Sequence, residues 1–201
     1  MRRILPVLWF FHAAAMVAGA EDLSPELDAS AWETLRSGFS VVLHRRPDET
    51  PEKTDARFVT VAALVPGSRS RIWEVIHDKE HAAEFIDGVL ESRVIEREEH
   101  EILVEQVTRV GGPKGAYRYR LLHKLTPEKK AVFTYDGGEL KDVIGAWWIF
   151  DGPDPGHFLV VYSLHIDAGF FAPQALVKAG MRKTMPRTIE AIAREVAKRG
   201  E

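Results

Sequence analysis

The sequence contains no cysteine, and this absence excludes several classes of site. Without thiols there is no disulfide, no thiolate zinc site and no lipid-modified N-terminal cysteine. The chain also lacks the Gly-x-Ser-x-Gly motif of serine hydrolases, a glycine-rich dinucleotide fingerprint and a phosphate-binding loop. Sequence motifs therefore assign no catalytic residue, no cofactor and no metal ligand.

Neither sign of charge dominates the chain. It has 27 lysine and arginine residues against 30 aspartate and glutamate residues, which gives a formal net charge of −3 at pH 7. A slightly acidic chain is not expected to bind nucleic acid, because such binding needs a basic surface. Apolar residues make up 45% of the 201 residues, which suits one globular domain with a core of its own.

Long hydrophobic runs are absent except near the N-terminus. Residues 4–20 are apolar apart from His12, follow a pair of arginines, and end in Ala18-Gly19-Ala20. This order is typical of a secretory signal peptide, and the run is slightly short for a spanning helix. We expect residues 1–20 to be a cleaved signal peptide, which would make the protein periplasmic or secreted. An uncleaved membrane anchor is the alternative.

Residues 21–57 are predicted to form an N-terminal extension of one helix and one strand. Ser24 can cap the helix, Pro25 suits its first turn, and Gly38 can end it. Residues 39–45 then have the pattern of a strand, and a polar, proline-containing connection follows.

Residues 58–201 are predicted to form the main domain, of α+β class. Apolar and polar residues alternate as in half-buried antiparallel strands until residues 174–198, where the period becomes helical. Pro186 lies inside that helical segment, so we expect it to kink or interrupt the helix. A long amphipathic helix after a run of strands predicts a curved sheet wrapped around the helix. The strand segments are 57–65, 90–98, 101–110, 116–125, 130–137, 143–151 and 157–167.

The segment 77–81 reads His-Asp-Lys-Glu-His and fits the His-x-x-Glu-His signature of one class of zinc hydrolases. That chemistry needs both histidines one turn apart on a continuous helix, together with a third ligand. Asp78-Lys79 instead indicates the end of one short helix, at 68–78, and the start of another, at 79–86. We therefore interpret the segment as a solvated bend between two short helices.

Two longer segments resemble the START-like superfamily, which includes pollen-allergen, polyketide cyclase and coenzyme Q-binding branches. They are "VPGSRSRIWEVIHDKEHAAEFIDGVLESRVIE" and "IGAWWIFDGPDPGHFLVVYSLHIDAGFFAPQALVKAGMRKTMPRTIEAI". The resemblance covers the chain from about Thr34 to the end. It implies a helix-grip fold. In this fold a curved antiparallel sheet wraps around a long C-terminal helix, and an apolar cavity lies between the sheet and the helix. Trp148, directly after Trp147, departs from the family pattern. The sequence therefore leaves undecided which of these two residues faces inward.

Aromatic residues alternate along several of the predicted strands. Tyr117 and Tyr119 share one face of their strand, and Arg118 and Arg120 share the other. The rings could line the cavity that the resemblance implies, or they could fill a solid core with tyrosine hydroxyls at its rim. Under the first interpretation, the ligand-binding residues are Phe85, Tyr117, Tyr119, Phe133, Trp147, Tyr162, Phe171, Met181 and Met185.

The resemblance implies a partner that is a hydrophobic small molecule, such as a lipid, sterol or quinone, which the protein binds and transports. Basic residues of the last helix fit either transient contact with a membrane surface or an ordinary solvated face. Two alternatives stay open. One is a cyclase or dehydrase, with acid–base work done by Glu105, Arg109, His123 or His165. The other is an interaction module without a cavity.

Overall fold

The computed structural model describes residues 24–49, 55–110, 115–170 and 172–200. An eight-stranded antiparallel sheet forms its centre, in the order β1-β2-β8-β7-β6-β5-β4-β3. From β3 to β8 each strand pairs with the next along the chain, and β2 then pairs with β8. The strands are β1 (Val41–Leu43), β2 (Val59–Pro66), β3 (Val89–Arg97), β4 (Glu101–Arg109), β5 (Ala116–Thr126), β6 (Lys130–Gly138), β7 (Asp142–Asp151) and β8 (His157–Asp167).

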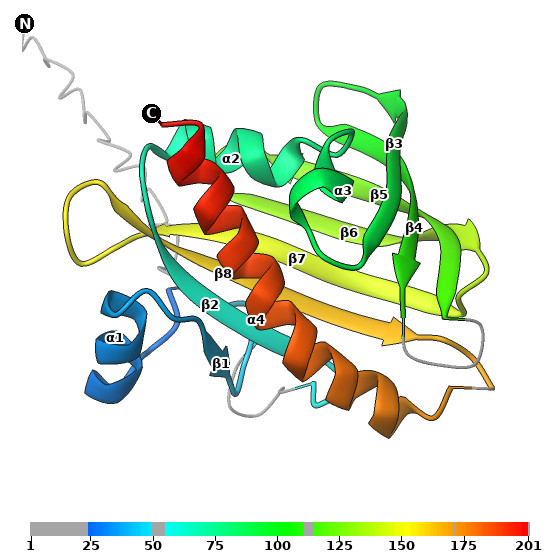
Figure 1. Ribbon diagram of the computed structural model, residues 1–201, viewed down its shortest axis with the longest axis horizontal. Coiled ribbons are helices and arrows are strands. Elements are labelled where there is room, and N and C mark those ends of the chain that lie inside the picture. Colours follow the sequence, from blue (N-terminus) through cyan, green and yellow to red (C-terminus); the bar gives the residue numbers. More distant parts are fainter. Residues whose placement is uncertain (1–23, 50–54, 111–114, 171, 201) are drawn as a thin grey trace, which may run out of the picture.

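The C-terminal helix α4 (Gln174–Lys198) lies across one face of the sheet, which we call the inner face (Figure 1). It continues through Pro186, so the interruption that the sequence allowed does not occur. Proline removes a backbone donor, but both halves of the helix bury apolar side chains against the sheet, and this packing offsets the loss. The buried apolar side chains of α4 are Val177, Met181, Met185, Ile189, Ala191, Ile192 and Val196.

Two short helices follow β2 and are separated by a bend. Helix α2 (Arg69–His77) begins at Ser68, whose hydroxyl accepts a hydrogen bond from the backbone N–H of Arg71. Helix α3 (Ala82–Phe85) starts only five residues after α2 ends. The predicted bend is confirmed, but it is not fully solvated, because His77 and Lys79 are buried.

The N-terminal helix α1 (Ala29–Arg36) begins later than the sequence predicted. Asp28, rather than Ser24, caps it by accepting a hydrogen bond from the backbone N–H of Ala31 at 2.8 Å. Residues 24–28 have no helical structure, so Pro25 is not in the first turn. Gly38 follows the end of the helix with φ of 83°, a left-handed conformation that glycine adopts easily.

The opposite, outer face of the sheet carries a second apolar core. Leu35 of α1 packs there with Trp148 and Leu159, and all three are almost fully buried. Trp148 therefore faces outward, whereas its neighbour Trp147 faces α4. The N-terminal segment thus covers an outer face on which a large ring would otherwise meet water.

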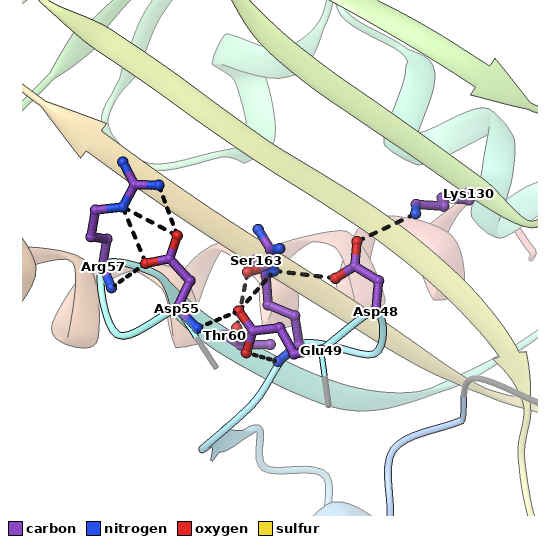
Figure 2. Close-up of polar contacts among 8 residues, drawn as sticks. Asp48, Glu49, Asp55, Arg57, Thr60, Lys130 and Ser163 are labelled. Atoms are coloured by element: carbon purple, nitrogen blue, oxygen red, sulfur yellow. Dashed lines mark hydrogen bonds and ion pairs between the residues drawn. The ribbon is translucent and has the colours of Figure 1, made fainter. Parts of the chain in front are cut away.

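Polar contacts fasten the connection between β1 and β2 to the sheet (Figure 2). The carboxylate of Asp48 lies 3.5 Å from the Nζ of Lys130, at the start of β6. Glu49 accepts a hydrogen bond from the backbone N–H of Asp55 at 3.0 Å, which closes the loop on itself. The Lys130 ammonium also lies 5.2 Å from the ring centre of Trp148. The loop and the outer core are therefore joined at β6.

The helix-grip architecture expected from the sequence is confirmed: a curved, unclosed antiparallel sheet grips a long C-terminal helix. The expected signal peptide at residues 1–20 lies outside the described residues. Of the helices that the structure describes, none is long and apolar enough to cross a membrane.

Replacing Leu35 by alanine tests whether α1 belongs to the same cooperative unit as the sheet. Leu35 is 1% exposed, so the change leaves a cavity and is expected to lower the free energy of unfolding by about 2–4 kcal/mol. Leu176→Ala, on the exposed side of α4, is the control and is expected to change it by less than about 0.5 kcal/mol. Urea denaturation measures both. Equal effects would mean that α1 is only loosely attached.

Candidate functional site

A cavity of about 290 Å³ lies between the inner face of the sheet and α4. It exists because α4 packs mainly on β2 and β8 and leaves the inner face of the strands from β4 to β7 without a covering helix. Most of the lining is apolar, from Ile86 and Val89 at one side to Val143, Ile166 and Val177 at the other. Such a lining can hold the apolar part of a small molecule.

The mouth of the cavity is marked by the lining residues that are exposed to solvent. Asp87 and Arg109 stand on one side, at the turn after α3 and the end of β4. Gly180 and Thr184 stand on the other side, in the middle of α4. The opening therefore lies between the α3–β3 turn and α4.

A row of rings forms the floor of the cavity. Trp147 and Tyr162 are stacked, with ring centres 3.9 Å apart and planes inclined by 8°. Phe133 lies 6.4 Å from Tyr162 and 5.2 Å from the His123 ring. The Phe133 ring can lie flat on β7 only because residue 145 is glycine: a Cβ there would be 2.1 Å from the Phe133 Cζ.

The structure brings together most of the residues predicted to contact a ligand. Six of the nine line the cavity: Tyr119, Phe133, Trp147, Tyr162, Met181 and Met185. Tyr117 is buried in the same core but does not line the cavity. Phe85 is half-buried outside it, with the guanidinium of Arg199 5.7 Å above its ring. Phe171 lies outside the described residues. Contact between any of these side chains and a ligand stays a prediction.

The tyrosines supply polar tips in the apolar wall. The Tyr119 hydroxyl donates to the Oγ1 of Thr108 at 3.1 Å, so β5 and β4 are joined at the cavity wall. Burial raises the pKa of both Tyr119 and Tyr162, so each phenol stays protonated at neutral pH. The Tyr162 hydroxyl can donate to a carbonyl or hydroxyl oxygen of a bound molecule, whereas the Tyr119 oxygen, whose proton is used by Thr108, can accept a hydrogen bond.

A cluster of nitrogen-bearing side chains lies at one end of the cavity and was not assigned to the site from the sequence. Lys79, in the bend between α2 and α3, is buried and donates from its Nζ to the carbonyl oxygen of Ile76 at 2.7 Å. Burial, together with a smaller effect of the Arg97 charge, lowers its pKa to about 8. His123 of β5 is 3% exposed, and neither of its ring nitrogens has a hydrogen-bond partner in the described part of the chain.

His77 completes this cluster beneath the bend. Its Nδ1 lies 2.9 Å from the carbonyl oxygen of Trp73, and its ring packs 3.9 Å from the Trp73 ring. Burial lowers its pKa to about 3, and the charge of Lys79 adds to this effect. Burial likewise holds the pKa of His123 well below its usual value. At neutral pH the two histidines are therefore neutral, and Lys79 carries the charge of the cluster.

The bend itself is held by ion pairs to the end of α4. The Asp78 carboxylate lies 2.7 Å from the Nη2 of Arg199 and 2.7 Å from the Nδ1 of His81. Arg199 also binds Glu195 at 2.8 Å. Burial raises the pKa of Asp78, but hydrogen bonds from His81 and Arg199 outweigh it and the pKa is lowered. Of the two carboxylates adjacent to Lys79 in sequence, Asp78 is thus shared with other partners and Glu80 is exposed.

The histidines of the His-Asp-Lys-Glu-His segment are separated rather than paired. His77 ends α2 and points inward, whereas His81 lies in the bend and its side chain is 58% exposed. Within the described ranges no three His, Asp or Glu side chains gather in a way that could hold a metal ion. Two of the four residues considered for acid–base work lie elsewhere: Glu105 pairs with Arg93 and Arg118, and His165 borders a second hollow. The other two, Arg109 and His123, line the cavity.

One signal in the sequence could have located His123. Tyr117, Tyr119, Leu121 and His123 follow each other at alternate positions of β5, so an inward Tyr119 requires an inward His123. No comparable signal exists for Lys79, because a bend between two short helices has no period that predicts which side chain turns inward.

Gly145→Ala tests the close contact beneath the Phe133 ring. The new methyl group would overlap the ring and the backbone oxygen of Ser163, so the free energy of unfolding is expected to fall by about 1–3 kcal/mol. Gly180→Ala is the matched control. Its Cβ meets nothing within 4 Å inside a helix, and it is expected to raise the free energy of unfolding by about 0.5–1 kcal/mol. Opposite signs in urea denaturation support the contact, and a stabilising Gly145→Ala would contradict it.

The buried histidines predict a loss of stability in mild acid. In the unfolded chain each takes up a proton near pH 6.5, whereas the folded chain resists protonation down to about pH 3 at His77. Acid therefore favours the unfolded chain, and the free energy of unfolding falls by up to about 1.4 kcal/mol per pH unit for each histidine below pH 6.5. His123→Phe should flatten the dependence between pH 6.5 and 4.5, whereas the exposed control His100→Phe should not. Identical pH curves for His123→Phe and the unmodified protein would contradict the assignment.

Comparisons with known proteins agree with this geometry. A family model described as polyketide cyclase / dehydrase and lipid transport matches residues 65–193. No curated protein matches the chain in sequence. The Zhui aromatase/cyclase from Streptomyces sp. R1128 superposes with a TM-score of 0.63 at 16% identity, covering 72% of this chain and 95% of that one. Human StAR-related lipid transfer protein 5 gives 0.60 at 12% identity, covering 87% of this chain and all of that one.

A START superfamily protein from Mycobacterium smegmatis gives a TM-score of 0.61 at 13% identity, covering 70% of this chain and 97% of that one. At such identities each structural likeness shows the fold alone. The family model, however, spans more than half of the chain and includes the bend, the floor of the cavity and most of α4. The chain therefore belongs to the polyketide cyclase / dehydrase and lipid transport family of the START-like superfamily.

Proposed function

We propose that this protein binds and carries a hydrophobic small molecule in the cavity between the sheet and α4. The observation that supports the proposal most directly is the cavity itself, an apolar space of about 290 Å³ bounded by the ring floor and α4. A module that served only as an interaction surface would gain stability by filling this space, because interiors are otherwise close-packed. Retaining the space costs stability and is accounted for by an occupant.

The size of the cavity limits the occupant. Liquid water occupies about 30 Å³ per molecule, so 290 Å³ corresponds to about ten water molecules or a similar number of methylene-sized groups. A ten-carbon chain or a two-ring aromatic molecule fits inside this space, and a larger molecule would have to extend through the mouth. Among the lipids, sterols and quinones considered from the sequence, the smaller members are therefore favoured.

Burial of the occupant accounts for useful affinity. Ten methylene groups at about 0.8 kcal/mol each give a gain of about 8 kcal/mol on transfer from water. Association costs several kcal/mol in lost translational and rotational freedom. The polar tips of Tyr119 and Tyr162 can recover part of that cost by hydrogen bonding. A net gain of about 5–7 kcal/mol is then left, which corresponds to a dissociation constant of about 10–200 μM.

The N-terminal residues bear on where in the cell the protein works. If residues 1–20 act as an export signal, the carrier works in the periplasm or outside the cell. There it would move an apolar molecule through water and could touch a membrane transiently through the basic side of α4, on which Lys183 and Arg187 are exposed.

A second candidate is catalysis of the cyclase or dehydrase kind in the same cavity. The observation that favours it is His123, a neutral and unpartnered imidazole in the cavity wall, 5.2 Å from the Phe133 ring. A neutral imidazole can accept a proton from a substrate carbon or hydroxyl group. Carriage of the ligand needs no such group, so turnover that is abolished by His123→Phe while binding persists would favour the enzyme.

Binding of the neutral fluorophore N-phenyl-1-naphthylamine tests the cavity proposal. The protein is expected to bind one molecule with micromolar affinity, seen as a rise in fluorescence. Met185→Trp fills the cavity and should weaken binding at least tenfold, and Leu176→Trp, exposed on the same helix, should leave it unchanged.

Overpacking at Met185 could unfold the chain, so circular dichroism accompanies the titration and Thr184→Trp provides a second variant. Thr184 is exposed at the mouth, where a tryptophan blocks entrance without crowding the core. Saturable binding that is equally strong in all three variants would place the fluorophore elsewhere and contradict the proposal.

A further inference from the structure

Lys79 is a buried ammonium group without an ion-pair partner in the described part of the chain. It is 7% exposed, and its one hydrogen bond goes to the carbonyl oxygen of Ile76. An ammonium group has three donors, so two of them are unused by the protein. Burying a charge in this way is costly unless an opposite charge compensates it.

The neighbouring groups compensate this charge only in part. The carboxylate of Asp78 favours the charged form of Lys79, but it is shared with Arg199 and His81, and burial outweighs its effect. Glu80, on the other side of Lys79 in the chain, is exposed. Arg97, at the end of β3, adds positive potential at Lys79 rather than relieving it. His77 from α2 and His123 from β5 face the same region, and both are electrically neutral at pH 7 because burial and the charge of Lys79 oppose their protonation.

Lys79 nevertheless lines the cavity, together with His123 and the apolar floor. The charged residues at the mouth, Asp87 and Arg109, are exposed and therefore solvated. Lys79 is thus the one charged side chain that both lines the cavity and is buried among the described residues. Its free donors meet a space that otherwise accepts apolar groups.

We propose that the physiological ligand is an amphiphilic acid, whose carboxylate binds the Nζ of Lys79 while its apolar body lies along the rings of Phe133, Tyr162 and Trp147. This inference rests on the proposed function and specifies its ligand class. A carboxylate supplies the missing opposite charge and accepts the unused donors, which makes a charge-assisted hydrogen bond in a dry site. His123, whose ring packs on Phe133, can donate to the second carboxylate oxygen.

The charge in the cavity selects against other head groups. An amine would meet Lys79 with like charge, and a neutral alcohol would leave the ammonium uncompensated. A single-chain or two-ring carboxylic acid of about ten carbons satisfies both the volume and the charge.

Decanoate and decan-1-ol form a matched pair of probes that differ in the head group. Isothermal titration at pH 7 with the full chain is expected to give decanoate at least about tenfold tighter binding than decan-1-ol. Lys79→Met keeps the length and apolar character of the side chain and removes its charge. It should weaken decanoate at least tenfold and leave decan-1-ol within about threefold. Lys183→Met, on the exposed side of α4, is the control and should change neither.

A pH series on the unmodified protein tests the same contact without a substitution, in case Lys79→Met does not fold. Decanoate is ionised throughout pH 6.5–9.5, since its carboxyl group resembles that of glutamate, with a pKa of about 4.3. Lys79 in the free protein loses its proton above about pH 8. Decanoate affinity should therefore stay level up to about pH 8 and then fall up to tenfold per pH unit, whereas decan-1-ol affinity should stay level.

The outcomes separate this inference from the proposed function. Equal binding of decanoate and decan-1-ol, with no effect of Lys79→Met and no fall above pH 8, would overturn the acid ligand and leave the apolar carrier intact. Binding of N-phenyl-1-naphthylamine without any binding of decanoate would do the same. Failure of all three molecules to bind would overturn the carrier proposal itself.

Discussion

The contact of α4 with only part of the sheet determines the rest of this structure. The helix buries its apolar stripe on β2 and β8, and a single helix is too narrow to cover the inner face of eight strands. The part of the inner face between β4 and β7 is therefore left without a covering helix, and the apolar cavity lies there.

The bend between α2 and α3 then places a positive charge at one end of that cavity. The Asp78–Arg199 pair holds the bend to the last turn of α4, and the Lys79 side chain is directed inward rather than toward solvent. One end of the cavity is therefore positive and the floor is aromatic. The outer core, with Leu35 and Trp148, makes no contact with this space and contributes stability to the same sheet from the other side.

Much of the fold could be predicted from the sequence because strand alternation is a strong local signal. The strands from β3 to β8 fall within two residues of the predicted segments, and the inward position of Tyr119 follows from the outward position of Arg118. The start of α1 was misplaced because Ser24 and Asp28 are both good caps, and only packing of Leu35 on the outer face decides between them. The bend that carries Lys79 is held by the pair of Asp78 and Arg199, which are 121 residues apart in the chain, and no local pattern contains such a contact.

The close contact between Gly145 and the Phe133 ring has a consequence for how this sequence can change over time. Position 145 has no room for a Cβ while position 133 carries a large ring, and the two residues are direct partners across β6 and β7. Neither position can vary alone without overlap or an empty space. In homologous chains the two sites should covary, with glycine at the first wherever an aromatic residue occupies the second, and with a larger residue at 145 only where 133 has become small.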